Sequence, residues 1–281
     1  MSAVIVLAIL GVFIGFVLTQ PRRSRRRRVE SMRVFAQGHG LEPTTLTTIE
    51  LAKTPFDAFN HFRLSPGPAA RGRWHGIDVV VFSYSWTRGR SRQSYYAVIA
   101  SLPLHGPRLV IGRETAATRR KAQRDIAVGD APFDQRFLVK GDDDAAQALL
   151  DPLMRQWLNG TADTVSFELV GSDLLVITQQ VSLSGRTAGL VLDALLAVTT
   201  EFCDHVPAGF RERFGTNGWP ATGSATGTPS MPAPVIRALL TRSRDHFVVG
   251  LFATFALFFV LLAALAIADG AHQLRIRNTL D

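Results

Sequence analysis

The hydrophobic pattern places two long apolar runs near the ends of the chain, with a region of mixed polarity between them. Residues 2–20 and 247–268 contain no charged side chain. As helices they would be about 28 and 33 Å long, and the hydrocarbon core of a bilayer is roughly 30 Å thick. The pattern therefore predicts two transmembrane α-helices, one at each of these runs.

Between the two runs, the spacing of apolar residues changes several times from helical to strand-like. The predicted helices are 28–38, 145–158 and 186–205, and the predicted strands are 76–86, 94–102, 108–111, 136–140, 165–170 and 173–178. Gly171-Ser172 fits the turn of a two-residue hairpin. Asp142 and Asp151 fit helix N-caps, and Pro152 should kink or split the helix that it lies in. This order predicts an α+β fold, an antiparallel sheet with flanking helices, held between the two transmembrane helices.

Composition adds the domain boundaries. Residues 215–234 are rich in Gly, Pro, Ser and Thr and should form a flexible linker. Residues 29–214 are then one soluble α+β domain. Residues 235–246 combine an apolar face with arginines, which fits either a juxtamembrane amphipathic helix or an early start of the second span. The other segments are a basic cytoplasmic flank at 21–28 and an external tail at 269–281.

The distribution of charge predicts the topology. Six arginines follow the first apolar run at once: Arg22, Arg23, Arg25, Arg26, Arg27 and Arg28. Short flanks rich in arginine stay in the cytoplasm, so both termini should lie outside the plasma membrane and the domain inside. A cleaved signal peptide would need its positive charge before the apolar run, which is absent here.

The domain itself carries no net charge. Residues 41–214 hold 19 Lys and Arg and 19 Asp and Glu, so the net charge of +8 comes from the flanks. A nucleic-acid-binding protein should carry its excess positive charge on the folded domain. The basic flanks instead predict attraction to the anionic inner leaflet, and no nucleic-acid partner is expected.

Motif searches give few candidates for chemistry. The sequence has no phosphate-binding loop, dinucleotide fingerprint, zinc-protease motif or nucleophile elbow, and no cofactor or metal is predicted. His75 with Asp78, and the acidic run Asp142 to Asp144, would be the candidates if the protein were an enzyme. Cys203 and His205 lie two residues apart on a predicted helix, so their side chains diverge, and Cys203 fits a buried small side chain.

Several strings carry a resemblance to a known group of proteins. HGIDVVVFSYSW, YYAVIASLPL, FDQRFLVKGDDDAAQALLDPLMRQWL and SFELVGSDLLV, within residues 70–205, resemble a group of uncharacterised actinobacterial membrane proteins that also place one soluble α+β domain beside membrane helices. The resemblance implies a shared fold. It implies no activity or functional residue, because none is assigned to the group.

Two surface features have functional interpretations. The predicted strands 76–86 and 94–102 flank a short polar segment and should form a long β-hairpin. A patch on and beside this hairpin could face anionic lipid, or it could be a solvated sheet edge guarded by arginines: Arg71, Arg73, Trp74, Trp86, Arg88, Arg90 and Arg92. Gly11 and Gly15 form a G-x-x-x-G pattern in the first span, which would allow close helix packing within the chain or in a homo-oligomer.

Three functional classes remain open. The first is a membrane-anchored, non-enzymatic cytoplasmic domain that binds a partner protein or the inner leaflet. The second is a membrane-bound enzyme of unrecognised type. The third is a subunit of a transport assembly, which would need several chains because neither predicted span contains an ionisable residue.

Overall fold

The structure is a computed structural model that describes residues 26, 28–59, 64–88, 91–113, 125–161, 165–178, 185–216 and 219. Within these residues, no helix combines the length and the apolar character needed to cross a bilayer. The two predicted spans at 2–20 and 247–268 lie outside the described residues. So do the segment 235–246, the tail 269–281 and most of the linker. The two-span arrangement therefore stays a prediction.

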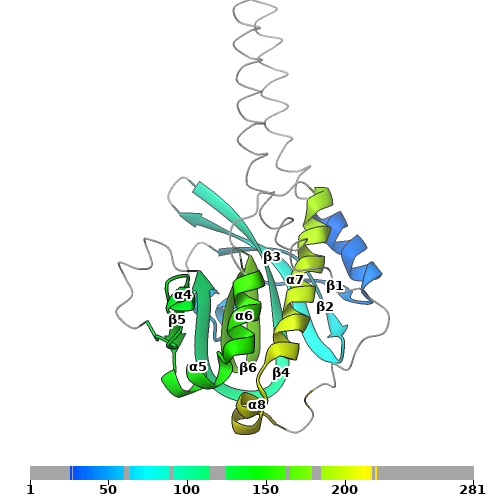
Figure 1. Ribbon diagram of the computed structural model, residues 1–281. Coiled ribbons are helices and arrows are strands. Elements are labelled where there is room, and N and C mark those ends of the chain that lie inside the picture. The colour runs from blue at the N-terminus through cyan, green and yellow to red at the C-terminus, as the bar shows by residue number, and fades with distance from the viewer. Residues whose placement is uncertain are drawn as a thin grey trace, which may run out of the picture. The chain divides into compact units, whose positions relative to one another are not determined.

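One antiparallel sheet organises the described part of the chain (Figure 1). Its strands are β1 (Glu42–Thr45), β2 (Leu64–Trp74), β3 (Ile77–Arg88), β4 (Ser91–Arg113), β5 (Phe137–Gly141) and β6 (Val165–Thr178). Strands β1 to β4 are successive neighbours, and both β5 and β6 pair with β4. Every pair is antiparallel, so the predicted α+β fold with an antiparallel sheet is confirmed.

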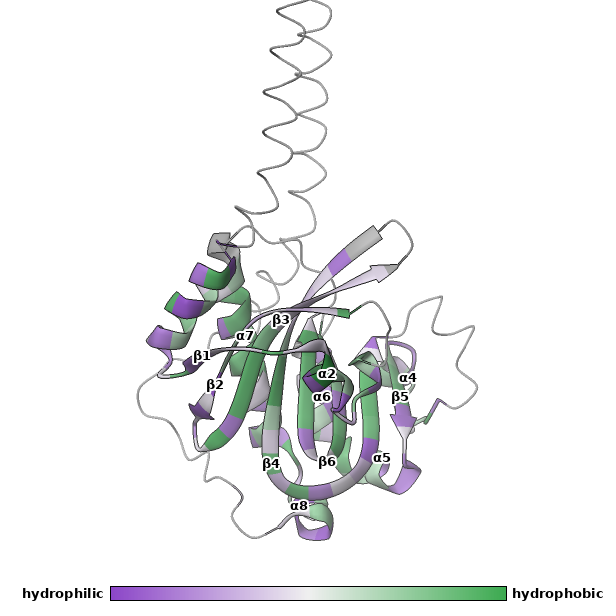
Figure 2. Ribbon diagram, turned by 180° about the vertical axis from the view of Figure 1, so that it is seen from behind, coloured by the Kyte–Doolittle hydropathy of each residue, from purple (hydrophilic) through white to green (hydrophobic). Residues whose placement is uncertain are grey.

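The long strand β4 bends in the middle and curves beneath β6 (Figure 2). Its residues 97–101 pair with 173–177, whereas its residues 109–111 pair with 167–169. Gly106 lies opposite Gly171 between these two ladders, and Gly171 has a φ of 61°. The predicted strands 94–102 and 108–111 are thus two parts of β4. The predicted hairpin at Gly171-Ser172 is wrong, because 165–170 and 173–178 are two parts of the single strand β6 and both pair with β4. The left-handed backbone at Gly171 still suits a glycine.

The sequence pattern missed β1 and β2. β2 has the sequence LSPGPAARGRW, whose prolines and glycines disfavour a strand. It forms because His75 and Gly76 connect it to β3 through a tight turn in which both residues have positive φ. That is the backbone of a two-residue hairpin turn. The hairpin of β3 and β4 matches its prediction.

Short helices and one long helix flank the sheet. Besides a helix over residues 28–38, the structure has α2 (Thr48–Ala52), the 3₁₀ turn η1 (Asp57–Phe59), α4 (Ala131–Asp134), α5 (Asp143–Leu149), α6 (Pro152–Thr161), α7 (Gly185–His205) and α8 (Ala208–Phe214). The caps of α5 and α6 are as predicted. Asp142 accepts a hydrogen bond of 2.8 Å from the Ala145 amide, and Asp151 one of 2.8 Å from the Met154 amide. Pro152 therefore begins a second helix.

The two faces of the sheet bury two separate apolar clusters. Because side chains alternate along a strand, Val79 and Val81 contribute to the larger cluster, and Phe82 and Tyr84 to the smaller one. The larger cluster also contains buried side chains from α5, α6, α7 and the helix over 28–38. Leu51 of α2 and Phe59 of η1 belong to the smaller cluster, and α2 lies over the second face in Figure 2.

An ion cluster around the buried carboxylate of Glu168 holds η1 against this second face. Glu168 of β6 is only 7% exposed, and it accepts hydrogen bonds from the Arg108 guanidinium and from the Asp57 amide. Arg108 also forms an ion pair of 2.6 Å with the Asp57 carboxylate. The carboxylates raise the pKa of Arg108, although burial opposes them. The buried charge of Glu168 is therefore compensated from two elements.

β2 is irregular where it pairs with the end of β3. The register of β2 against β3 shifts between Pro66 and Ala69. Prolines 66 and 68 cannot donate ladder hydrogen bonds, and Gly67 lies directly against Ser83. A Cβ at position 67 would meet the Ser83 hydroxyl and lie 2.9 Å from its carbonyl oxygen. Only a glycine allows β2 to approach β3 this closely.

We expect Gly67→Ala to destabilise the protein. The added methyl group must push the Ser83 backbone away, which should cost roughly 2 kcal/mol and lower the Tm by roughly 4–8 °C for a domain of this size. Thermal unfolding of the full chain in neutral detergent would measure the change. Gly38→Ala is the matched control, because a Cβ there meets nothing within 4 Å. Equal Tm values for the two variants would contradict the close approach of β2 to β3.

Candidate functional site

A groove of about 680 Å³ lies between the start of the helix over 28–38 and the irregular part of β2. Its lining comes from the helix, from β1 with Leu46, from residues 65–69 of β2 and from residues 83–85 of β3. Small-molecule sites in proteins commonly enclose roughly 300–1,000 Å³. The groove is therefore large enough for one small ligand.

The charged groups of the groove have one sign. Its lining includes Arg28 and Arg33, and none of the described residues that line it carries a carboxylate. Ser65, Ser83 and Ser85 add hydroxyl groups. Burial raises the pKa of Tyr96, and the positive charge of Arg28 opposes this rise, so Arg28 lies close enough to act on a buried phenol. The arrangement favours a ligand with negative charge.

The helix over 28–38 keeps its place through one apolar face. Met32, Phe35 and Ala36 are at most 5% exposed and belong to the larger cluster. Arg28 and Val29 lie one turn before Met32 and Arg33, so the groove receives side chains from the flank of the helix next to its buried face. Docking of the helix by its core residues thus forms the wall of the groove.

His39, directly after this helix, fixes its far end to α7. The His39 Nε2 atom lies 3.1 Å from the Asp193 carboxylate, and its Nδ1 atom lies 2.9 Å from the Phe35 carbonyl oxygen. Its ring packs between Phe35 and Trp74, with ring centroids 4.5 and 5.1 Å away. The Asp193 carboxylate beside the ring raises the pKa of His39, although burial opposes it. The charged imidazolium therefore strengthens the attachment of the helix.

The predicted hairpin patch is divided between the faces of the sheet. Arg71 and Arg73 are exposed on β2, and each has an acidic neighbour. Arg71 is paired with Glu42 in the register, and Arg73 lies 3.7 Å from Asp78. Trp74 faces the other way, contacts His39 and donates a hydrogen bond to Thr200.

The rest of that patch is described only in part. Trp86 is half-buried on β3. The side chains of Arg88 and Arg92, and all of Arg90, lie outside the described residues. A lipid-facing role for the patch stays a prediction.

Most of the predicted basic block and the glycine pair also lie outside the described residues. This applies to Arg22, Arg23, Arg25, Arg27, Gly11 and Gly15. Arg26 is exposed, whereas Arg28 is half-buried and lines the groove. In the sequence, Arg28 fits the basic flank that predicts the topology, and no pattern distinguishes Arg33 or the serines. Nothing in their spacing indicates that four separate segments meet at one groove.

The candidates for catalysis lie in two parts of the fold, the turn between β2 and β3 and the start of α5. His75 is in the turn between β2 and β3, with its ring 4.5 Å from that of Trp74, while Asp78 is next to Arg73. Burial raises the pKa of the Cys203 thiol to about 12, which keeps it protonated. The Nδ1 atom of His205 donates a hydrogen bond of 2.8 Å to the Glu201 carbonyl oxygen.

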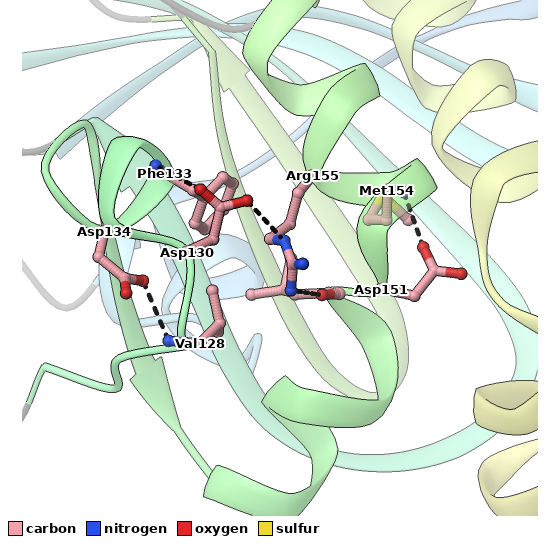
Figure 3. Close-up of polar contacts among 8 residues, drawn as sticks. Val128, Asp130, Phe133, Asp134, Asp151, Met154 and Arg155 are labelled. Carbon is pink, nitrogen blue, oxygen red and sulfur yellow. Dashed lines mark hydrogen bonds and ion pairs between the residues drawn. The ribbon is translucent and has the colours of Figure 1, made fainter.

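The acidic residues near α4, α5 and α6 serve as helix caps and ion-pair partners (Figure 3). Asp130 caps α4 at the Phe133 amide and lies 3.1 Å from the Nε atom of Arg155. Asp134 accepts a hydrogen bond of 3.0 Å from the Val128 amide. Asp144, in the run that could have bound a cation, lies 3.1 Å from Arg213. Among the described residues, no three His, Cys, Asp or Glu side chains are arranged to hold a metal ion.

Comparisons with known proteins add little to this geometry. No protein-family model matches the chain, and no curated protein matches it. Among solved structures, the chain is similar to the crystal structure of the mycobacterial trehalose monomycolate transport factor A, with a TM-score of 0.45 and 15% identity. The match covers 65% of this chain and 98% of that one. At this degree of likeness, no function, ligand or partner is transferred to this chain.

The pair of His39 and Asp193 should make stability depend on pH. The folded-state pKa of His39 is raised, so the pair stabilises the protein fully below the unfolded pKa of about 6.5 and loses its effect as pH rises through the folded value. We expect Asp193→Asn to lower the Tm at pH 5.5 by roughly 2–4 °C, or about 1 kcal/mol, and much less at pH 9.

Thermal unfolding of the full chain at both pH values would measure this difference. Asp204→Asn is the control, because Asp204 is exposed on the same helix. A deficit for Asp193→Asn that is equal at pH 5.5 and pH 9 would contradict the role of the imidazolium.

Proposed function

We propose that this protein is a membrane-anchored, non-enzymatic domain that binds anionic lipid of the inner leaflet in the groove beside the helix over 28–38. The observation that carries the proposal is the charge of the groove, whose lining, as far as the structure describes it, has two arginines and no carboxylate. The domain as a whole is neutral over residues 41–214. A site of one sign within a neutral domain favours a ligand of the opposite sign.

The position of the groove in the sequence supports the same ligand. Arg28 is the last residue of the predicted basic flank, eight residues after Gln20, the end of the predicted first span. A short flank of this kind is expected at the headgroup level, where each basic residue attracts anionic lipid by about 1 kcal/mol. The exposed arginines of β2, in contrast, have the acidic neighbours Glu42 and Asp78. They are less suited to bind an anion.

We expect Arg28→Gln with Arg33→Gln to weaken binding of anionic lipid. Loss of two basic residues should reduce the affinity by roughly 2 kcal/mol, or about 30-fold. The full chain would be placed in nanodiscs of equal parts phosphatidylglycerol and phosphatidylcholine, and the lipids that remain bound would be counted by native mass spectrometry. The wild type should retain phosphatidylglycerol in preference to phosphatidylcholine.

Arg71→Gln with Arg73→Gln is the matched control for this experiment. It removes the same charge from exposed positions that do not line the groove and leaves the basic flank intact. Equal losses in the two double variants would mean that the lipids respond to total charge alone and would contradict the proposal. A loss confined to the control would move the lipid contact to the predicted hairpin patch.

The topology has its own test. Ser224→Cys places a thiol in the predicted linker, and Cys203, which is buried with a raised pKa, should not compete for reagent. We expect a membrane-impermeant maleimide to label this variant only after cells are lysed. Labelling of intact cells would place the domain outside and exclude the inner leaflet as the source of the ligand.

A further inference from the structure

The groove has a second kind of lining that charge alone does not explain. Val29 and Met32 from the helix, Leu46 after β1 and Tyr84 of β3 bring apolar groups to it. Val29 is 49% exposed, although it lies one helical turn before the buried Met32. Met32 and Tyr84 are already buried in the core clusters, whereas Val29 and Leu46 are partly open to water, and a hydrocarbon chain would remove these two from it.

The helix places apolar and basic groups side by side. Arg28 is four residues before Met32, and Val29 is four residues before Arg33, so each row of the helix contributes one guanidinium and one apolar side chain. A ligand that contacts this wall therefore meets positive charge and hydrocarbon together. This combination suits an amphiphile.

The strand that closes the groove also favours an apolar part of the ligand. Pro66 and Pro68 have no backbone N–H, so residues 65–69 offer few donors for a polar ligand. Gly67 brings this stretch against Ser83, and both residues line the groove. A volume of about 680 Å³ fits one ligand of moderate size. A phospholipid with two acyl chains could place only one of them in it.

We propose that the groove binds a single-chain anionic amphiphile, in which one acyl chain carries an anionic head group. The head group is bound by Arg28 and Arg33, and the chain lies against Val29, Met32 and Leu46. This inference rests on the proposed function, because it names the class of anionic lipid that the groove accepts. Ligands of this class include fatty acids and anionic lysophospholipids.

The test uses the full chain in phosphatidylcholine nanodiscs and a palmitic acid that carries a diazirine in its chain. After photolysis, adducts are mapped by peptide mass spectrometry. We expect adducts on peptides that contain residues 28–46 and 64–69. Unlabelled palmitate and lysophosphatidylglycerol should compete for this labelling, whereas lysophosphatidylcholine and glycerol phosphate should not.

Two variants of the same helix sharpen the test. Val29→Asp removes an apolar group from the groove and adds a negative charge beside the arginines, so labelling should fall about tenfold. Val34→Asp makes the same change at a position that is 60% exposed and does not line the groove, and labelling should not change. Both side chains are exposed, so neither variant should impair folding.

Several outcomes would overturn the inference. These are the absence of adducts on the two groove peptides, equal labelling of the two variants, and competition by glycerol phosphate, which would indicate a site for the head group alone. A crosslink between the groove and the chain's own linker, with no lipid adduct on the groove peptides, would also overturn it. If phosphatidylglycerol retention still depends on Arg28 and Arg33 in that case, the proposed function stands and only the single-chain ligand falls. If both fail, the groove does not bind lipid.

Discussion

The close approach of β2 to β3 at Gly67 is the constraint on which the candidate site depends. Because a Cβ at this position would meet Ser83, the strand lies deeper here than a regular ladder would allow. The register shift between Pro66 and Ala69 follows from the same contact. Residues 65–69 of β2 and Ser83 of β3 both line the groove, so this part of its wall is held by a backbone contact.

The second requirement is a helix held at both ends of its buried face. Met32 and Phe35 fix it to the core of the sheet, and His39 fixes its end to Asp193 on α7. A helix of this length would be marginal in isolation, so tertiary packing supplies most of its stability. The arginines that line the groove therefore keep their positions because of residues on other faces of the same helix. One short segment therefore supplies both the charged residues that line the groove and the residues that hold the helix in place.

Much of the fold could be predicted because it rests on local signals. The hairpin of β3 and β4 follows from alternating apolar residues, and the caps of α5 and α6 follow from Asp142 and Asp151. β2 could not be predicted, since its prolines and glycines contradict strand propensity and tertiary contacts override that preference. The continuity of β4 through its bend was missed for a similar reason. Prolines 103 and 107 interrupt the pattern there, and only the pairing with β6 joins the two halves.

The candidate site was less predictable than the fold because its parts come from four segments of the chain. Arg28 has the same local surroundings in the sequence as the arginines before it, and the positive-inside rule accounts for all of them. What sets Arg28 apart is a neighbour 68 residues away, Tyr96, whose pKa it lowers against the effect of burial. A residue can therefore serve as a topology signal and as part of a binding site at once. Where a basic flank continues into a docked helix, the arginines that face the fold acquire a fixed geometry that the flank alone cannot give them.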